Sequence, residues 1–260
     1  MKKTIALFAL MLCLLSAKAQ NTAVGPSEKL VYTATYNMSG ILNELAQVTM
    51  ETSAVKTSKA TLLRLKCTAA TYSKWDSFFK IRDLYESYVS PVSLKPFLYK
   101  REINEGGYYK YMKYTFKHSS GQVKSQKKKK RSNGTIWEEN KNVSISSNTN
   151  DLVTTLYKLR NVDFSNLTKG QSKTFKVIFD NETHTVNFKY LGTETIPSAL
   201  GTKTCYKLAI TISNNNVLKG SHENLLWLTA DANKIPLYAK FKIAVGNGEL
   251  KIKSASGLKH

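Results

Sequence analysis

Apolar and polar residues alternate along most of the chain after its first twenty positions. The alternation is clear from Leu30 to Met38, from Phe175 to Phe179, from Val186 to Tyr190, from Tyr206 to Ile212 and from Leu237 to Val245. Successive side chains of a strand point to opposite faces, so a period of two predicts strands with one buried face. The pattern predicts a mostly β protein.

The connections between these segments are short and polar. Examples are residues 180–182, residues 214–216, and Gly246-Asn247-Gly248, which predicts a hairpin turn before a last strand. Short connections join antiparallel neighbours rather than parallel strands. We therefore expect one large curved antiparallel sheet, or a barrel or half-barrel.

The period changes between residues 150 and 160, where small or apolar residues recur at i, i+3, i+4 and i+7, beginning at Leu152. Thr149, Asn150 and Asp151 precede this run as candidate caps, with Asp151 giving a negative charge at its start, and Lys158 and Arg160 lie near its end. Opposite charges at the two ends complement a helix dipole. The segment predicts the single short helix of the fold.

The first nineteen residues have the organisation of a secretory signal peptide. Lys2 and Lys3 precede an apolar run from Ile5 to Leu15, and small residues end at Ala19. The run is about eleven residues, whereas a membrane span needs about 20. We expect cleavage between Ala19 and Gln20, and a single β-rich domain over residues 20–260.

The charge of the chain is strongly positive. Lys and Arg number 39 against 18 Asp and Glu, and loss of Lys2, Lys3 and Lys18 with the leader lowers the net charge from +21 to +18. Such a charge attracts polyanions: anionic lipid, acidic glycan or nucleic acid. Export to the periplasm, to the outer membrane or outside the cell favours an envelope lipid or glycan, and no nucleic acid is expected.

Two cysteines remain after the leader, Cys67 and Cys205. Alternation places Cys67 on an inward face and Cys205 on a face shared with lysines. This argues against a Cys67–Cys205 disulfide. Two isolated cysteines also lack the paired spacing of a zinc site, so no metal is expected.

Tyrosines interleave with lysines between residues 108 and 117. Tyr111 and Lys113 could stack on and pair with a sugar or base. The alternative is an ordinary strand whose Met112, Tyr114 and Phe116 point inward while Tyr111 and Lys113 face water.

A run of five cations follows: Lys127, Lys128, Lys129, Lys130 and Arg131. Ser132-Asn133-Gly134 comes next and predicts a hairpin turn. A closed core could not accept the inward-pointing lysines. Either the run is an exposed edge strand protected by lysine, or the concave face of the sheet is wet and binds an anion.

The sequence contains none of the common catalytic or phosphate-binding motifs. There is no G-x-S-x-G, H-E-x-x-H, G-x-x-x-x-G-K-[ST] or G-x-G-x-x-G, and the four histidines are scattered. We expect no cofactor and favour a non-catalytic protein.

An ordered set of short motifs resembles the bacterial domain-of-unknown-function 3108 family (DUF3108), exported proteins of Gram-negative envelopes. The resemblance covers nearly all of the chain after the leader and implies a β-rich fold and an envelope location, but no activity. The leader boundary is also similar to that of secreted proteins of Bacteroides-type bacteria. The motifs are Glu28-Lys29-Leu30-Val31-Tyr32, Phe79-x-x-x-Asp83-x-x-x-Ser87-Tyr88, Asp151-Leu152 with Leu159-Arg160, Gly192-x-Glu194, Gly201-Thr202-x-x-Cys205, and Leu228-Thr229-x-Asp231 to Pro236.

Three polar residues of these motifs are candidate ligand-binding residues. Asp83 and Ser87 lie four apart on a predicted strand and therefore share a face. They could line a polar site, or could cap a turn or bond a sheet edge. Asp231 belongs to a predicted turn between two strands.

Three functions are compatible with these features. The first is a non-catalytic exported protein whose sheet binds an amphiphilic or anionic envelope ligand, such as a lipid or lipid-linked glycan. The second is a hydrolase or lyase acting on envelope polysaccharide, which requires Asp83, Glu102 or Asp231 to cluster in a cleft. The third is a structural partner of an envelope complex.

Overall fold

The computed structural model describes residues 20–38, 41–213, 224–243 and 246–260. In these residues the chain forms one fourteen-stranded sheet and one short α-helix, α2. Strands that follow one another in sequence pair antiparallel, except β8 and β9, which are the two edges of the sheet, and β1 also pairs with β14. The predicted large antiparallel sheet with a single helix near residues 150–160 is confirmed.

The elements follow one another in this order: β1 (Lys29–Met38), β2 (Ile41–Lys56), β3 (Thr61–Thr71), the 3-10 turn η1 (Ser73–Trp75), β4 (Arg82–Val89), β5 (Pro96–Glu105), β6 (Tyr108–Lys117), the 3-10 turn η2 (His118–Ser120), β7 (Gln122–Lys130), β8 (Ile136–Ser144), α2 (Leu152–Leu159), β9 (Ser172–Phe179), β10 (Glu182–Ile196), β11 (Lys203–Ile212), β12 (Leu225–Thr229), β13 (Pro236–Ile243) and β14 (Gly246–Ser256).

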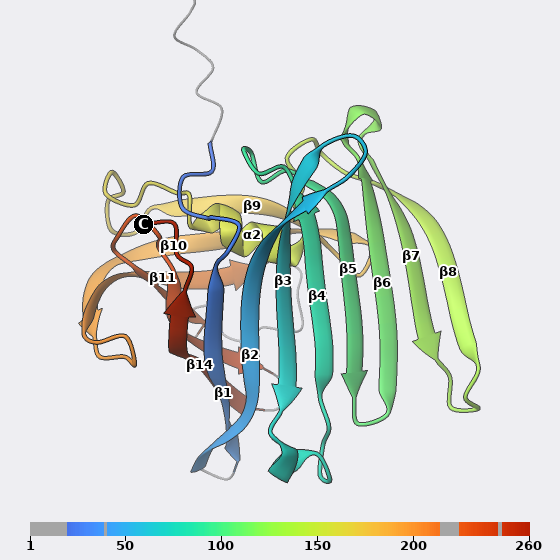
Figure 1. Ribbon diagram of the computed structural model, residues 1–260, viewed down its shortest axis with the longest axis horizontal. Coiled ribbons are helices and arrows are strands. Elements are labelled where there is room, and N and C mark those ends of the chain that lie inside the picture. The colour runs from blue at the N-terminus through green and yellow to red at the C-terminus, as the bar shows by residue number, and fades with distance from the viewer. Residues whose placement is uncertain (1–19, 39–40, 214–223, 244–245) are drawn as a thin grey trace, which may run out of the picture.

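The sheet curls so that β1–β8 face β9–β14, with α2 between the two halves (Figure 1). The helix contacts β3, β4 and β9. One core cluster joins buried residues of both halves of the sheet, among them Leu30, Leu65, Tyr114, Ile178 and Trp227. Alternation along each strand supplies this inner face, since every second residue points inward.

The segment β6 illustrates how the sequence pattern sets the two faces. Met112, Tyr114 and Phe116 are buried on the inner face, whereas Tyr111 and Lys113 are half-buried on the outer face. The prediction that Met112, Tyr114 and Phe116 point inward from an ordinary strand is confirmed.

The helix α2 begins at a buried cap, as predicted. The Oδ1 atom of Asp151 accepts hydrogen bonds from the backbone N of Thr154 at 2.8 Å and from the hydroxyl of Ser87 on β4 at 2.6 Å. Its other oxygen accepts from the Thr154 hydroxyl at 2.8 Å. The cap therefore fixes the start of α2 to the inner face of β4. Burial raises the pKa of the Asp151 carboxyl, and the Ser87 and Thr154 bonds oppose that rise.

The residue after α2 makes an ion pair that is fully buried. Both guanidinium nitrogens of Arg160 lie 2.6 Å from the carboxylate oxygens of Glu28, and both side chains are 0% exposed. Arg160 Nε donates to the carbonyl of Asn233 at 3.0 Å. The ring of Tyr157 lies 5.3 Å from the guanidinium carbon. One side chain thus joins the segment before β1, the end of α2 and the turn between β12 and β13.

The open side of the curled sheet is bridged by the tip of the β9–β10 hairpin. Asp180 and Asn181 form this tip with φ angles of 49° and 72°, a conformation that aspartate and asparagine tolerate better than most residues. Asp180 pairs with Arg101 on β5 and lies 2.7 Å from the ammonium of Lys110 on β6. Partial burial of the Asp180 carboxyl raises its pKa, but the Lys110 hydrogen bond and the Arg101 charge outweigh that effect and lower the pKa overall.

The second tip residue binds the inner face beside this ion pair. The backbone N of Asn181 donates to the hydroxyl of Tyr114 at 2.9 Å, and the Ser125 hydroxyl of β7 donates to the Asn181 side chain at 2.6 Å. The hairpin tip therefore crosses β5, β6 and β7 through side-chain contacts, whereas the two edge strands do not pair with each other.

The predicted last hairpin is present, since β13 pairs antiparallel with β14, but its predicted turn is misplaced. Gly246 and Gly248 are not a turn but the start of β14, where they pair with Ile243 and Phe241. A Cβ atom at Gly248 would lie 2.3 Å from the Phe241 ring, so glycine is required there by close packing rather than by a turn. The predicted connection at residues 214–216 and the leader of residues 1–19 with its cleavage site lie outside the described residues.

Cys67 and Cys205 are both free thiols, as the alternation indicated, although Cys205 is fully buried rather than on a lysine-bearing exposed face. Within the described part of the chain, none of the helices has the length and apolar character needed to cross a bilayer.

We expect Arg160→Met to lower the free energy of unfolding by about 3–5 kcal/mol, because it leaves the Glu28 carboxylate buried without its partner. The double variant Glu28→Gln, Arg160→Met should be less destabilised than the sum of the two single variants. Urea unfolding followed by circular dichroism measures both. The matched control is Lys29→Met, which removes an exposed pair with Glu51 at 3.1 Å and should cost at most about 1 kcal/mol. Equal costs for Arg160→Met and Lys29→Met would contradict the central role of the buried pair.

We expect Asp180→Asn to lower the free energy of unfolding by about 2 kcal/mol, because it weakens charge-assisted bonds to two buried cations. The lowered pKa of Asp180 means that its carboxylate stabilises the fold above the unfolded pKa and loses this contribution as the pH falls through the folded pKa. The difference between wild type and variant should therefore shrink in acid. Glu182→Gln, an exposed carboxyl on the same hairpin, is the control and should leave the pH profile unchanged.

Candidate functional site

The cation run lies on an interior strand. Lys127, Lys128, Lys129 and Lys130 belong to β7, which pairs with β6 on one side and β8 on the other, and Arg131 opens the following turn. The edge-strand interpretation of this run is therefore wrong, because β8 covers that edge.

A strand paired on both sides divides its lysines between two faces. Val123 and Ser125 are buried on the inner face, so Lys127 and Lys129, at the same parity, point inward and are half-buried. Lys128 and Lys130 point outward. The run is therefore not a single cationic cluster.

Two of the predicted ligand residues lie on the inner face of β4 and are already bonded. Ser87 is 0% exposed and donates to Asp151. Asp83 is 7% exposed and accepts a hydrogen bond from the backbone N of Asn104 on β5 at 3.0 Å. These bonds fit the structural alternative for the pair, the helix cap and the sheet bond.

The Asp83 carboxyl has a strongly shifted pKa. Burial raises the pKa most, the Asn104 hydrogen bond lowers it, and the nearby Glu105 carboxylate raises it again, with the result at about 7. Such a carboxyl can gain or lose its proton near neutral pH, although little of its side chain is exposed to solvent.

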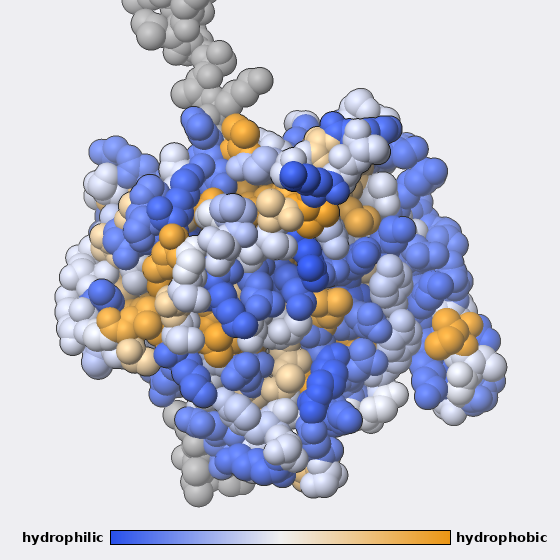
Figure 2. Space-filling view, viewed as in Figure 1, coloured by the Kyte–Doolittle hydropathy of each residue, from blue (hydrophilic) through white to orange (hydrophobic). Residues whose placement is uncertain are grey.

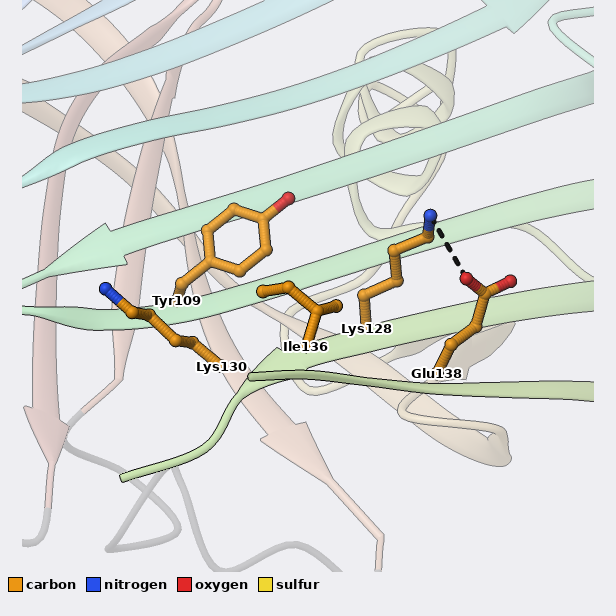
Figure 3. A pocket seen from close by; sticks show the side chains of 5 residues that line it. All are labelled: Tyr109, Lys128, Lys130, Ile136 and Glu138. Atoms are coloured by element: carbon orange, nitrogen blue, oxygen red, sulfur yellow. Dashed lines mark ion pairs between the residues drawn. The ribbon is translucent and has the colours of Figure 1, made fainter. Parts of the chain in front are cut away.

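The outer face of β6–β8 carries an open hollow of about 700 Å³ lined by Tyr109, Lys128, Lys130, Ile136 and Glu138. Figure 3 shows these side chains rising from the three strands, with Lys128 directed toward Glu138. The Lys128 ammonium lies 3.1 Å from a Glu138 oxygen. Hydrogen bonds from Gln126, which has the largest effect, and from Lys128 and Asn140 lower the pKa of the Glu138 carboxyl. Glu138 is therefore an anion beside the hollow.

A second hollow of about 480 Å³ adjoins the first at the ends of β5 and β6. Tyr109 and Lys130 line both hollows. The second is completed by Lys80, Arg82, Asn104, Gly106, Gly107 and Tyr108. We call the two together the outer groove. Figure 2 shows the face over β6–β8 as mostly hydrophilic, with a small apolar patch at the ends of β7 and β8.

The outer groove combines cations with aromatic rings. Its acidic neighbours are largely paired: Asp76 accepts two short bonds from Arg82, at 2.6 and 3.0 Å. Lys80 and Lys130 are both exposed at its rim. An ammonium beside a tyrosine ring can pair with a phosphate or carboxylate while the ring stacks on a sugar.

The remaining predicted site residues lie elsewhere. Tyr111 and Lys113 share the outer face of β6 with Tyr109 but do not line either hollow. Asp231 closes the β12–β13 turn, where its Oδ1 accepts from the Thr229 hydroxyl at 2.8 Å and from the backbone N of Lys234 at 2.9 Å. The five predicted ligand residues are therefore not brought together.

The carboxylates proposed for polysaccharide cleavage are also dispersed. Asp83 faces inward on β4, Glu102 faces outward on β5 opposite Tyr111, and Asp231 lies in a turn of the other half of the sheet. Among the described residues, no group of three or more His, Cys, Asp or Glu side chains could hold a metal ion.

The sequence interpretation missed Lys80, Arg82 and Ile136 as members of a site. Alternation could assign Tyr109 to the outer face, because Met112 is inward and odd positions are then outward. Alternation could not show that the loop before β4 lies next to the start of β6, since that contact depends on the order of strands in the sheet.

Two solved structures match the chain over most of its length. A beta-barrel-like protein of the domain of unknown function DUF1849 from Brucella abortus has a TM-score of 0.52 and 7% identity, over 88% of this chain and 97% of that one. At that identity the likeness supports the fold alone. A protein of Bacteroides fragilis, named as a candidate exported protein with a YmcC-like fold, has a TM-score of 0.37 and 8% identity, over 91% of this chain and 99% of that one.

No curated protein matches the chain. The sequence profile of the family described as "protein of unknown function (DUF3108)" matches residues 31–253, a span that includes every strand from β2 to β13. The match covers most of the chain, and the protein belongs to the DUF3108 family.

Proposed function

We propose that this protein is an exported, non-catalytic envelope protein that binds an anionic ligand, the headgroup of a lipid or of a lipid-linked glycan, in the outer groove. The observation that carries the proposal is the pair of adjoining hollows that share Tyr109 and Lys130. The leader-like residues 1–19 support export.

The chemistry of the groove supports an acidic saccharide or headgroup. Lys80 and Lys130 supply positive charge, Lys128 is paired with Glu138, and Tyr108 and Tyr109 supply ring faces. Phosphate or carboxylate groups pair with the first, and sugar rings stack on the second. The openness of the hollows suits a chain that lies along the surface rather than a small molecule that is enclosed.

The interior gives less support to an apolar cargo. The helix α2 places Val153 and Tyr157 against the inner face of the sheet, and both are buried. The hairpin tip at Asp180 and Asn181 occupies the inner face of β5–β7. A ligand bound outside the sheet requires no displacement of these elements.

The alternative of a polysaccharide hydrolase or lyase has no comparable support. A glycosidase positions two carboxyl groups on either side of one glycosidic bond. The carboxyls of Asp83, Glu102 and Asp231 lie on opposite faces or in separate halves of the sheet.

The groove is tested by two variants, Lys130→Gln and Tyr109→Ala. We expect each to weaken binding of deacylated lipopolysaccharide, a soluble phosphorylated oligosaccharide, by about tenfold, which corresponds to about 1.4 kcal/mol for one lost pairing or stacking contact. Isothermal titration calorimetry measures the affinity. Binding of wild type should weaken as salt rises, because exposed charges are screened.

The matched controls are the same two substitutions, a lysine to glutamine and a tyrosine to alanine, at positions outside the groove. Lys124→Gln lies on the same outer face of β7, and Tyr111→Ala lies on the same face of β6. Both should bind as wild type does. If Lys124→Gln weakens binding as much as Lys130→Gln, the interaction is with net charge alone, and the groove is not the site.

A further inference from the structure

One end of the sheet gathers most of the exposed apolar side chains. Of the six large apolar residues that are exposed in the described chain, four lie at the same end of the sheet. Phe78 (74% exposed) and Phe79 (45%) lie in the loop after β3, and Tyr108 (48%) and Ile136 (54%) are the first residues of β6 and β8, directly after the turns that follow β5 and β7. In an antiparallel meander these turns lie at the same end, and Figure 1 shows them together at the bottom of the view. We call this region the aromatic end.

The loop that carries the two phenylalanines is well bonded. Trp75 Nε1 donates to the carbonyl of Glu44 on β2 at 2.7 Å, and the backbone N of Phe79 donates to the Trp75 carbonyl at 2.9 Å. Asp76 holds Arg82 at 2.6 Å. The loop is therefore fixed to β2 and β4 rather than free to fold its side chains away from water.

The two phenylalanines have different environments within this loop. The Phe79 ring lies on the β5–β6 turn, where a Cβ atom at Gly106 would come within 2.6 Å of it. The backbone N of Gly106 also donates to the Lys80 carbonyl at 2.9 Å. Phe78 has no such cover and is the most exposed of the large apolar side chains. A bonded loop thus holds a phenylalanine in water, which costs hydrophobic free energy unless a partner covers it.

Cations surround these apolar tips. Lys74 and Lys80 flank the loop, and Lys130 and Arg131 lie beside Ile136 at the β7–β8 turn. The Asp76 carboxylate is paired with Arg82, so the end remains positively charged. Protruding aromatic residues ringed by lysine and arginine match the interface of an anionic bilayer, where rings enter the headgroup region and cations pair with lipid phosphates.

The arrangement fits a bilayer better than a protein partner. The apolar residues project from three separate turns at the tips of strands, instead of forming the continuous packed patch of a protein interface. The outer groove also opens at this end, because Lys80, Gly106 and Tyr108 line its second hollow. A headgroup below the aromatic end would lie next to the groove.

We propose that the aromatic end docks on a membrane surface that contains anionic phospholipid, with Phe78 entering the headgroup region and the surrounding cations pairing with lipid phosphates. The inference rests on the proposed function for its compartment and adds the lipid surface on which the ligand is met.

The experiment is co-sedimentation of the protein, purified from cells that express the full chain, with phosphatidylcholine vesicles that contain or lack phosphatidylglycerol. We expect binding to the anionic vesicles, weak binding to the neutral ones, and at least about a tenfold loss for Phe78→Ser. The control is Phe97→Ser, since Phe97 is 42% exposed at the start of β5, the opposite end of the strand, and also lies beside lysine. Thermal melts show whether both variants keep the wild-type fold.

Each outcome decides the proposal. It stands if Phe78→Ser alone loses binding to anionic vesicles, and it fails if wild type does not bind them, if both phenylalanine variants lose binding equally, or if Phe78→Ser binds as wild type does. If the protein sedimented with vesicles because its groove bound a glycolipid contaminant, Tyr109→Ala, and not Phe78→Ser, would lose vesicle binding.

Titration of Phe78→Ser with the soluble deacylated oligosaccharide separates this inference from the proposed function. Normal oligosaccharide binding with lost vesicle binding places docking at Phe78 and ligand recognition in the groove. If wild type binds the vesicles but not the oligosaccharide, the proposed ligand site in the groove is wrong and the proposed docking at the aromatic end remains.

Discussion

The fold depends on a charge pair that is completely removed from water. Glu28 and Arg160 are separated by 132 positions in the sequence, and burying both charges has a large desolvation cost. The pair is tolerable only if the guanidinium and carboxylate meet with good geometry and their remaining bonds are satisfied. Arg160 meets this condition with bonds to Glu28 and to the Asn233 carbonyl. The segments that supply these groups are therefore fixed relative to one another in the folded protein.

This requirement connects both ends of the chain to the helix. The Asn233 side chain accepts from and donates to the backbone of His260, at 3.0 and 2.6 Å, so the C-terminal residue is tied to the turn that contacts Arg160. Glu28 precedes β1, which pairs with β14. The first and last strands consequently meet beside the end of α2, and the helix is held inside the curl of the sheet at one end by Arg160 and at the other by Asp151.

The buried cations on the inner face of β5 and β6 are compensated by one carboxylate. Arg101 is 5% exposed and Lys110 11% exposed on that face, and Asp180 of the hairpin tip compensates both. The same contact bridges the side of the sheet where β8 and β9 do not pair. Backbone hydrogen bonding between β1 and β14 and the ion pairs of Asp180 therefore hold the curled sheet together on opposite sides of the molecule.

Local patterns predicted the elements well, and long-range contacts account for what they could not predict. The cap at Asp151, the inward Met112 and Tyr114, and the turn at Asp231 follow from residue type and period. The edge assignment of Lys127 to Lys130 failed because the order of strands in a sheet is not encoded in the alternation of one strand. Residues 246–248 have turn composition, yet Gly248 serves the Phe241 ring across a strand pair. Similarly, Glu28 and Arg160 were visible as motif residues, but their contact was not.

The pairing of β7 with β8 explains why the positive charge concentrates at one end. Lys127 lies opposite Glu139 and Lys128 opposite Glu138, so the first two lysines of the run face carboxylates. The next two cross-strand partners are apolar: Trp137 for Lys129 and Ile136 for Lys130. Opposite charges across a strand pair stabilise, whereas a cation opposite an apolar residue keeps its charge uncompensated while its stem covers the apolar side chain. Lys129 points inward, but on the outer face charge compensation decreases from Lys128 to Lys130 toward the turn. A cation without a cross-strand carboxylate therefore lies beside the exposed Ile136 at the aromatic end, which is the combination that an anionic interface requires.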